Sequence, residues 1–316
     1  MSERTWHDSP PAESLRGRIV LLTGGGGFIG GHLARAIAAA GAELHCTALA
    51  DSGEDAPPGV VHHVDLRDEA TTRDLISEIQ PALIFHLAGV VDTARAPGHV
   101  TRTLFGNLVT TVNVLLGALD AGVRRTVITG SSEELSEATA VNSPYAASKL
   151  GLPPYLDLFR SAYGLDVVSV RPFMAYGPGQ PGHRFVPETT LSLLAGTSPV
   201  VRDPQRVCDF IHVRDVVDGM IVAGVLRDLD GPSFDVGTGV GTRIKDACET
   251  LRSLIPEAPR IVYDDNPPSC DPHVAFEHGR PVAGWKARIT LENGLAETID
   301  WYRSRRFAGP SGEATS

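Results

Sequence analysis

The sequence predicts an α/β protein with a doubly wound parallel sheet. Short apolar runs alternate with helical segments through the N-terminal half, and the first run leads into a glycine-rich turn. The 316 residues can bury a sizeable core, with room for one large domain or two interlocked ones. Charged residues make up 21% and apolar residues 42% of the chain, a balance typical of soluble globular proteins.

Six short apolar runs predict the strands of this sheet, at residues 18–22, 43–47, 60–63, 83–87, 126–129 and 167–171. Helices are expected between them, at about 31–40, 71–80, 101–121 and 145–163. This alternation predicts parallel pairing through right-handed crossovers. Ligands of such a sheet bind beyond the carboxyl ends of its strands.

The second half of the chain has a different pattern. After Pro172 the sequence becomes rich in glycine and proline, with a helix expected near residues 187–195. Two runs, 209–213 and 233–236, are expected to return to the sheet. The polar ends of the chain, residues 1–16 and 306–316, are expected to be disordered tails.

Composition argues against several classes of function. The net charge of −10, without a dense Lys/Arg cluster, speaks against a nucleic-acid partner. No apolar stretch approaches the length that crosses a bilayer, and residues 1–16 lack the apolar core of a signal peptide, so no membrane partner is expected. The four cysteines form no Cys-x-x-Cys pair, so we expect no metal site, no disulfide framework and a cytoplasmic location.

Tyr145 and Lys149 lie four positions apart in the run S-P-Y-A-A-S-K at residues 143–149. On a helix this spacing stacks the two side chains on one face. A free tyrosine has a pKa of about 10, and a neighbouring ammonium lowers that pKa because it favours the phenolate. The pair is therefore suited to move a proton on or off a sugar or alcohol hydroxyl while a hydride moves elsewhere.

A glycine-rich turn, G-G-G-G-F-I-G at residues 24–30, follows the first predicted strand and opens a helix. Glycines at such a turn let the backbone approach a pyrophosphate closely. The helix N-terminus adds free N–H groups and a partial positive charge. The turn therefore predicts a dinucleotide site formed by Gly24, Gly27 and Gly30.

Together these motifs resemble those of the extended short-chain dehydrogenase/reductase family, in its NAD-dependent epimerase/dehydratase branch. The resemblance runs from about residue 18 to residue 303. Six further motifs support it in the family's order: V-D-L-R-D at 64–68, H-L-A-G at 86–89, G-S-S-E at 130–133, R-P-F-M-A-Y-G-P-G-Q at 171–180, D-F-I-H-V-R-D-V at 209–216 and F-D-V-G-T-G at 234–239.

The resemblance implies a Rossmann domain at residues 17–171, with returns at about 209–240, and a smaller substrate-binding lobe formed by residues 172–208 and 241–305. It also implies NAD as the cofactor, a nucleotide sugar as the substrate, and a homodimer formed through the two long helices. His86 is expected to be mainly structural. The implied cofactor contacts are Gly24, Gly27, Phe28, Ile29, Gly30, Asp65, Leu66, Leu87, Ala88, Gly89, Asn107, Tyr145 and Lys149.

The motif at 130–133 supplies the remaining catalytic candidates. Ser131 holds the place of the family's catalytic hydroxyl and of a substrate contact, with Ser132 as the alternative if the register shifts by one. Glu133 resembles the second proton carrier of nucleotide-sugar 4,6-dehydratases and decarboxylases. Glu133 or Glu134 suits this task if one of them is partly desolvated and its pKa raised, but two solvated glutamates at the start of a loop fit the pattern equally well.

The second strand departs from the family pattern. NAD users have an acidic residue at its end that binds the ribose hydroxyls, but Ala48 or Leu49 holds that place and Asp51 follows later. No Lys or Arg lies between Thr47 and Leu66, so a ligand for the 2′-phosphate of NADP is missing too. NAD is the expected cofactor, with NADP as the open alternative.

Two substrate contacts of the family are also replaced. Met174 stands where an asparagine is expected, and Cys208 where an arginine is expected. Arg206, two residues before Cys208 and on the same strand face, is predicted to take over as a phosphate ligand. Arg280 is the distant substitute for a second arginine.

The expected activity is modification of a nucleotide-activated hexose through a 4-keto intermediate. Epimerisation at carbon 4 ranks first, NADPH-dependent 4-ketoreduction second, and 4,6-dehydration with Glu133 as proton carrier third. Because the phosphate ligands are altered, reduction of a non-nucleotide ketone is the alternative from a different substrate class.

Overall fold

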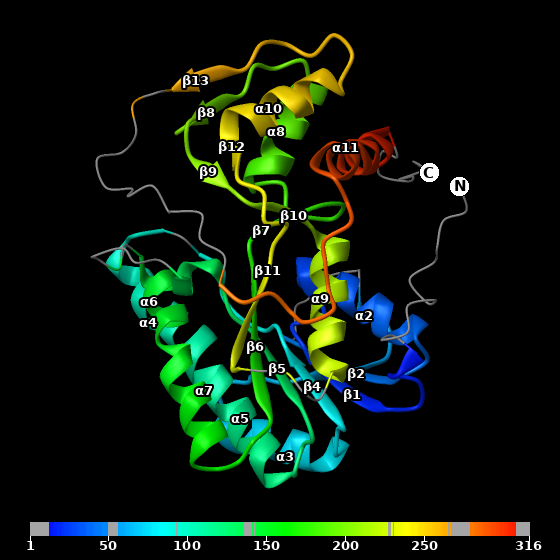
Figure 1. Cartoon of the computed structure of the whole chain (residues 1–316), viewed down its shortest axis with the longest axis vertical. Helices are drawn as coiled ribbons and strands as arrows, with labels where there is room; N and C mark the ends of the chain where they lie inside the picture. Colours follow the sequence, from blue (N-terminus) through cyan, green and yellow to red (C-terminus); the bar gives the residue numbers. More distant parts are fainter. Residues whose placement is uncertain are drawn as a thin grey trace, which may run out of the picture.

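The computed structural model describes residues 13–49, 56–92, 94–135, 141, 143–226, 229, 231–264, 266 and 279–307. Its body is a seven-stranded sheet in which every pairing is parallel, in the order β11-β6-β5-β4-β1-β2-β3 (Figure 1). The strands are β1 (Ile19–Thr23), β2 (Glu43–Ala48), β3 (Val60–His63), β4 (Leu83–His86), β5 (Thr126–Thr129), β6 (Val167–Pro172) and β11 (Ser233–Val236). The predicted fold class is confirmed, and the six predicted strands agree with β1–β6 to within one residue at either end.

The order of the strands reverses at β1. From β1 the chain moves outward through β2 to β3, then returns to β4 on the other side and continues through β5 and β6 to β11. Connections on the two sides of β1 therefore run in opposite directions. This arrangement leaves a crevice at the carboxyl ends of β1 and β4, which is where such sheets bind ligands.

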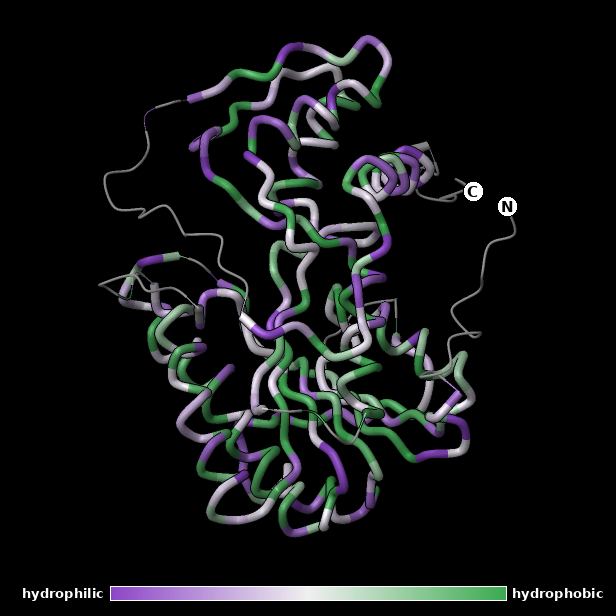
Figure 2. The backbone as a smooth tube through the Cα atoms, in the orientation of Figure 1, coloured by the Kyte–Doolittle hydropathy of each residue, from purple (hydrophilic) through white to green (hydrophobic). Residues whose placement is uncertain are grey.

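Both faces of the sheet are buried, which explains why its strands are continuous apolar runs. On one face, α2 (Phe28–Ala39) and α9 (Val213–Val225) pack on side chains such as Leu22 and Phe85. On the other face, α3 (Glu69–Ile79) and further helices pack on the alternate residues, such as Leu21 and Ile84. Figure 2 shows the central strands as predominantly apolar segments.

The helix expected at 101–121 is interrupted. After the short turns η2 (Pro97–His99) and α4 (Val100–Thr103), the chain makes a π-helical turn, η3 (Leu104–Val109), before α5 (Thr110–Asp120). A π turn inserts one extra residue per turn and is frequent at functional sites. Contrary to the expectation from the sequence, the run Pro97–Asp120 is long and apolar enough to cross a membrane by length and composition alone. Half of its apolar window is buried within the protein, where α5 packs on α3.

The helix expected at 145–163 is two helices, α6 (Pro144–Leu150) and α7 (Leu152–Ser161), joined at Gly151. Pro153 and Pro154 lie in the first turn of α7. Because proline has no N–H, neither residue can donate to a carbonyl at the end of α6, and a new helix begins there instead.

A smaller lobe lies above the carboxyl ends of the sheet (Figure 1). Its helices are α8 (Phe185–Leu194), α10 (Ile244–Ser253) and α11 (Leu291–Phe307), around a third apolar core. Three strand pairs complete it: β7 (Met174–Tyr176) with β10 (Phe210–His212), β8 (Val200–Arg202) with β13 (Val262–Asp264), and β9 (Val207–Cys208) with β12 (Thr242–Arg243).

The second half of the chain and the two chain ends differ in part from the sequence prediction. The run 209–213 does not return to the main sheet, because β10 pairs with β7 instead, whereas 233–236 does return as β11. Leu15, inside the expected N-terminal tail, is fully buried in the core beneath α2, and α11 continues to Phe307. Residues 1–12 and 308–316 lie outside the described residues.

Candidate active site

A cavity of about 620 Å³ lies between the carboxyl edge of the sheet and the smaller lobe. The glycine turn and the end of β4 line one side, and the end of β5 with α6 lines another. The loop after β6 and the region around β9 close it from the lobe. The motifs that the sequence singled out therefore meet at one place, although they come from segments far apart in the chain.

The glycine turn is closely packed. Gly24 has a φ of +74°, and a β-carbon there would lie 2.6 Å from the Ala88 backbone nitrogen. At Gly30 a β-carbon would lie 2.0 Å from the Gly24 carbonyl oxygen. Only glycine fits at these two positions without a backbone shift, because backbone atoms cannot move away as a flexible side chain can.

The first turn of α2 is open for an anion. Gly27 caps the helix without any side-chain hydrogen bond to the end, and the first turn carries no acidic residue. Phe28, Ile29 and Gly30 in this turn line the cavity. Free N–H groups at a helix N-terminus bind phosphate, so the residues present fit the pyrophosphate of a dinucleotide.

The ends of β1 and β4 are joined by a buried hydrogen-bond network. Thr23 Oγ1 accepts from the backbone N–H groups of Leu87 and Ala88 at 3.1 Å, and it bonds His86 Nδ1 at 2.7 Å. The other ring nitrogen of His86 bonds Thr111 Oγ1 at 3.1 Å. Burial lowers the pKa of His86 to about 3. A neutral, doubly bonded imidazole holds the strand ends together, which is the structural role expected of it.

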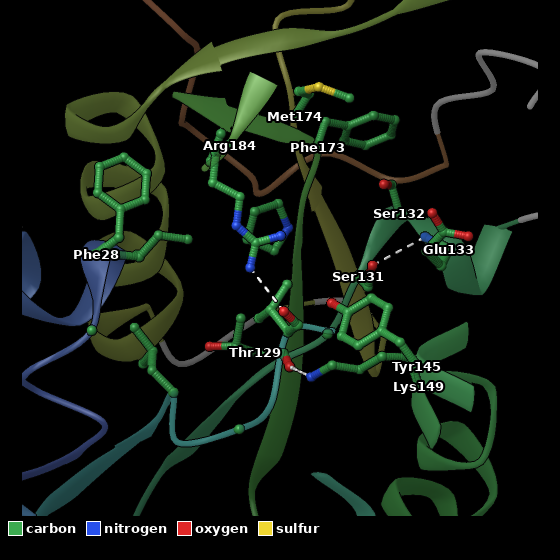
Figure 3. A pocket seen from close by; sticks show the side chains of 18 of the residues that line it. Phe28, Thr129, Ser131, Ser132, Glu133, Tyr145, Lys149, Phe173, Met174 and Arg184 are labelled. Carbon is green, nitrogen blue, oxygen red and sulfur yellow. Dashed lines mark hydrogen bonds between the residues drawn. The ribbon is translucent and has the colours of Figure 1, made fainter. Parts of the chain in front are cut away.

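Ser131, Tyr145 and Lys149 converge on the opposite wall (Figure 3). The hydroxyl groups of Ser131 and Tyr145 point toward one another and are hydrogen-bonded. The Lys149 ammonium, one turn along α6 from Tyr145, donates to the carbonyl oxygen of Thr129 at 2.7 Å. Ser143 caps α6 by accepting from Ala146 N–H, which fixes where this helix begins.

The pKa of Tyr145 is raised in the structure, whereas the sequence predicted that the neighbouring Lys149 would lower it. Burial, the largest influence, raises this pKa, while the hydrogen bond from Ser131 and the charge of Arg184 lower it. Burial also lowers the pKa of Lys149 to about 8. Desolvation of the phenol therefore outweighs the opposing influences, since burial disfavours every charged form.

Asn107 lies within the π turn and makes three buried contacts. Its Oδ1 accepts from Val90 N–H at 2.7 Å, and its Nδ2 donates to Val90 O at 3.1 Å and to Ser148 Oγ at 2.8 Å. The amide thus ties the segment after β4 to α6. Asn107 also lines the cavity, as do the other predicted cofactor contacts around it.

Ser132 and Glu133 line the cavity beside Ser131. They belong to a short 3-10 turn, η4 (Ser132–Leu135), whose Glu133 N–H donates to Ser131 Oγ at 3.2 Å. Both side chains are half-buried. Glu134, which follows, points inward and is not among the residues that line the cavity.

Three predicted site residues are not brought into this cavity. Asp65 forms a two-pronged ion pair with Arg67, and Leu66 is buried with its carbonyl accepting from Asn113. Arg280 extends toward Gly231, beside the start of β11, away from the carboxyl edge of the sheet. Asp51, the later acidic residue considered for the ribose, lies outside the described residues.

The lobe contributes two arginines to the cavity. Arg206, the predicted replacement phosphate ligand, lines it next to Cys208. Arg184, which the sequence reasoning missed, also lines it and donates from Nη2 to the Val91 carbonyl at 2.8 Å. A single cation in a glycine- and proline-rich loop has no spacing pattern, so only the tertiary structure reveals it.

Known proteins resemble this chain over nearly its whole length. It matches the NAD dependent epimerase/dehydratase family over residues 20–237. A UDP-glucose 4-epimerase of Mycolicibacterium smegmatis is 29% identical, over 90% of this chain and 98% of that protein. A dTDP-glucose 4,6-dehydratase of an Actinoplanes species is 27% identical, over 91% and 98%. The solved UDP-glucose 4-epimerase of Thermus thermophilus, in complex with NAD, gives a TM-score of 0.74 at 26% identity, over 90% and 99%.

Proposed function

Because this chain belongs to the NAD-dependent epimerase/dehydratase family, we propose that it modifies a nucleotide-activated hexose through a 4-keto intermediate and that its overall reaction is 4-epimerisation. One observation carries the proposal. A single cavity is lined by the glycine turn, which fits a dinucleotide, and by Ser131, Tyr145 and Lys149, which can move a proton. The similar epimerases and dehydratases, covered almost completely by this chain, support the substrate class.

The residues divide the chemistry between them. When bound, NAD would supply an acceptor and donor of hydride for carbon 4 of the sugar. Tyr145 takes the proton of the 4-hydroxyl, and Ser131 donates a hydrogen bond to the same oxygen. Lys149 holds positive charge one helical turn away, which stabilises the phenolate. Reduction of the 4-ketone on its opposite face, with Tyr145 returning the proton to the oxygen, would give the 4-epimer.

A second reaction, 4,6-dehydration, is favoured by one specific observation. Glu133 lines the cavity two residues after the catalytic hydroxyl of Ser131, where a carboxylate could remove the proton from carbon 5. Its place next to Ser131 is fixed by the bond from its own N–H to Ser131 Oγ. Loss of water across carbons 5 and 6 would then follow the same first oxidation.

Incubation with UDP-glucose, UDP-galactose, dTDP-glucose and a 4-keto-6-deoxy sugar nucleotide, with and without NADPH, tests the proposal. Interconversion of the two UDP-hexoses without added reductant, followed by nuclear magnetic resonance, is the expected result. A 4-keto-6-deoxy product would establish dehydration instead, and NADPH loss only with a 4-keto-6-deoxy substrate would establish ketoreduction. The nucleotide-sugar proposal would be wrong if no sugar nucleotide turned over and UDP and dTDP left the melting temperature unchanged.

We also infer a homodimer in a reducing cytoplasm. Helices α4 to α7 run along one side of the body (Figure 1) and expose apolar side chains. Those more than a third exposed are Val100, Leu104, Phe105, Tyr155 and Leu158. A second copy packing on this side would bury them, as helix pairs at subunit interfaces do. The described cysteines are all free thiols, which fits a reducing compartment.

A further inference from the structure

Glu134 places a second, hidden carboxyl group behind the proposed active site. Its Oε1 accepts a hydrogen bond from the Ser131 backbone N–H at 2.8 Å. Its Oε2 is buried and has no hydrogen-bond partner among the described residues. A β-carbon on Gly130 would lie 2.5 Å from Oε1, so this glycine leaves the space that the carboxyl group occupies.

Two side chains hold the same three residues at the end of β5. Lys149 donates to the carbonyl oxygen of Thr129, and Glu134 accepts from the N–H of Ser131. Gly130 lies between these two bonds. The position of the Ser131 hydroxyl, and hence its hydrogen bond with Tyr145, therefore depends on both the ammonium and the carboxyl group.

Charged groups face Glu134 from every element around it. Lys149 and the Tyr145 hydroxyl face it from α6, Arg171 from β6 and Asp235 from β11. Arg171 and Asp235 pair with each other, with Nε to Oδ1 at 2.7 Å. Lys149, in contrast, donates to a backbone carbonyl. Glu134 is the carboxylate whose charge acts on the Lys149 ammonium.

Glu134 and Lys149 both change their charge near neutral pH. Burial is the largest influence on Glu134 and raises its pKa to about 7, whereas Lys149 and the Ser131 N–H act in the other direction. Burial lowers the pKa of Lys149 to about 8, and the charge of Glu134 raises it. Below pH 7 the carboxyl group is mostly protonated and gives Lys149 no support. Above pH 7 the Glu134 carboxyl group is mostly an anion, and its charge favours the ammonium form of Lys149.

We propose that Glu134 is a positioning residue of the reaction, whose carboxyl group fixes the Ser131 backbone and whose anion keeps Lys149 in its ammonium form beside Tyr145. This inference rests on the proposed function of Ser131, Tyr145 and Lys149. The hydrogen bond to Ser131 does not require the charge, because a neutral amide oxygen can also accept it, although an anion accepts it more strongly. Charge and hydrogen bond can therefore be separated by substitution.

The pH dependence of kcat/KM in Glu134→Gln and Glu134→Leu separates the two roles. Glutamine keeps the acceptor for Ser131 N–H but cannot ionise. We expect Glu134→Gln to stay within about twofold of the unsubstituted protein near pH 6, where Glu134 is mostly neutral. Near pH 8.5 it should fall about tenfold, because without the anion the pKa of Lys149 is lower and less of its side chain is ammonium. Glu134→Leu also leaves a buried N–H unpaired and should lose activity at both pH values.

A matched control is Glu292→Gln, which removes one carboxylate from an exposed position in the first turn of α11. Its pH profile should follow that of the unsubstituted protein. If kcat/KM of Glu134→Gln, divided by that of the unsubstituted protein, stays constant across the pH range, then Glu134 has only a structural role. Full activity of Glu134→Gln at every pH would overturn the proposal outright.

A spectroscopic measurement separates this inference from the proposed function. Burial also raises the pKa of Asp218 to about 6, so infrared difference spectra between about pH 6 and about pH 8 should show protonated carboxyl intensity from both Glu134 and Asp218. The part of this intensity that belongs to Glu134 should be lost as pH rises and be absent in Glu134→Gln. This part requires no substrate and persists even if no nucleotide sugar is turned over. If turnover is found but the carboxyl intensity is unchanged in Glu134→Gln, the function stands and the assignment of Glu134 fails.

Discussion

Tyr145 is partly buried beside the cavity, and this desolvation acts against its proposed role in proton transfer. Burial raises its pKa, and the bond from Ser131 and the charge of Arg184 act against this rise. In the described structure the side chain is therefore a neutral phenol at pH 7. It becomes a good base only when further positive charge is added nearby, which a bound oxidised nicotinamide would provide.

Replacing Tyr145 with phenylalanine should lower kcat by about 10²–10⁴-fold, the usual contribution of a positioned acid or base. The ring and its packing are retained, so NAD affinity and melting temperature should change little. Steady-state turnover of the substrate found above, with NAD binding followed by calorimetry, measures both. Tyr163→Phe, at an exposed tyrosine after α7, is the control. Unimpaired turnover in Tyr145→Phe would remove Tyr145 from the mechanism.

His86 predicts a pH dependence of stability. Its pKa is about 3 in the folded protein against about 6.5 when unfolded, so the unfolded chain binds the proton first as pH falls. The neutral His86 ring therefore contributes fully to the free energy of unfolding above pH 6.5. This contribution falls as the pH drops toward the folded pKa, by about 2 kcal/mol at pH 5. Urea unfolding of His86→Gln at pH 7 and pH 5 should show a smaller acid loss than the unsubstituted protein. An equal loss in both proteins would show that His86 does not set the acid sensitivity.

Individual site residues were predictable where the chemistry is local in sequence. Gly24, Gly30, Tyr145 and Lys149 come from short motifs whose spacing alone fixes a turn or a helix face. Whether Glu134 is solvated or desolvated stayed open, because its burial depends on Gly130 and on strands that arrive later in the chain.

The sequence predicted the helices and strands best where a segment is buried on all sides. Strands β1–β6 are apolar runs covered on both faces, so the pattern and the structure agree closely. The long helices were less predictable, since the π turn at Leu104–Val109 keeps the helical pattern while changing its hydrogen bonds. Helix α9 was missed because it begins at Val213, directly after the last residue of strand β10, with no loop between them.

The glycine turn and α2 offer a matched pair of substitutions. Gly30→Ala places a β-carbon 2.0 Å from the Gly24 carbonyl oxygen and should weaken NAD binding by at least tenfold while lowering the melting temperature. Gly31→Ala meets nothing closer than 3.6 Å and should raise the free energy of unfolding by about 0.5–1 kcal/mol, as alanine does inside a helix. Calorimetric NAD titration and urea unfolding test the pair. Equal tolerance of both would contradict the close packing of the turn.

On the scale of the whole molecule, the exposed apolar side of α4 to α7 predicts association. Leu158→Glu places a charge among the exposed apolar side chains of the proposed interface and should convert dimers to monomers, halving the mass measured by light scattering. Val200→Glu, at an exposed apolar residue on β8 of the lobe, is the control and should remain dimeric. A monomeric unsubstituted protein at every concentration would contradict the dimer.

The reversal of strand order at β1 has a consequence for how this protein could acquire new specificities. The turn after β1 provides the nucleotide-binding backbone, while the side chains that act on the substrate come from segments after β5 and from the lobe. Because these parts belong to separate crossovers, mutations in one can accumulate without remodelling the other. Variation in the loops after β5 and β6 can therefore change the reaction catalysed while the ancestral cofactor scaffold is inherited intact.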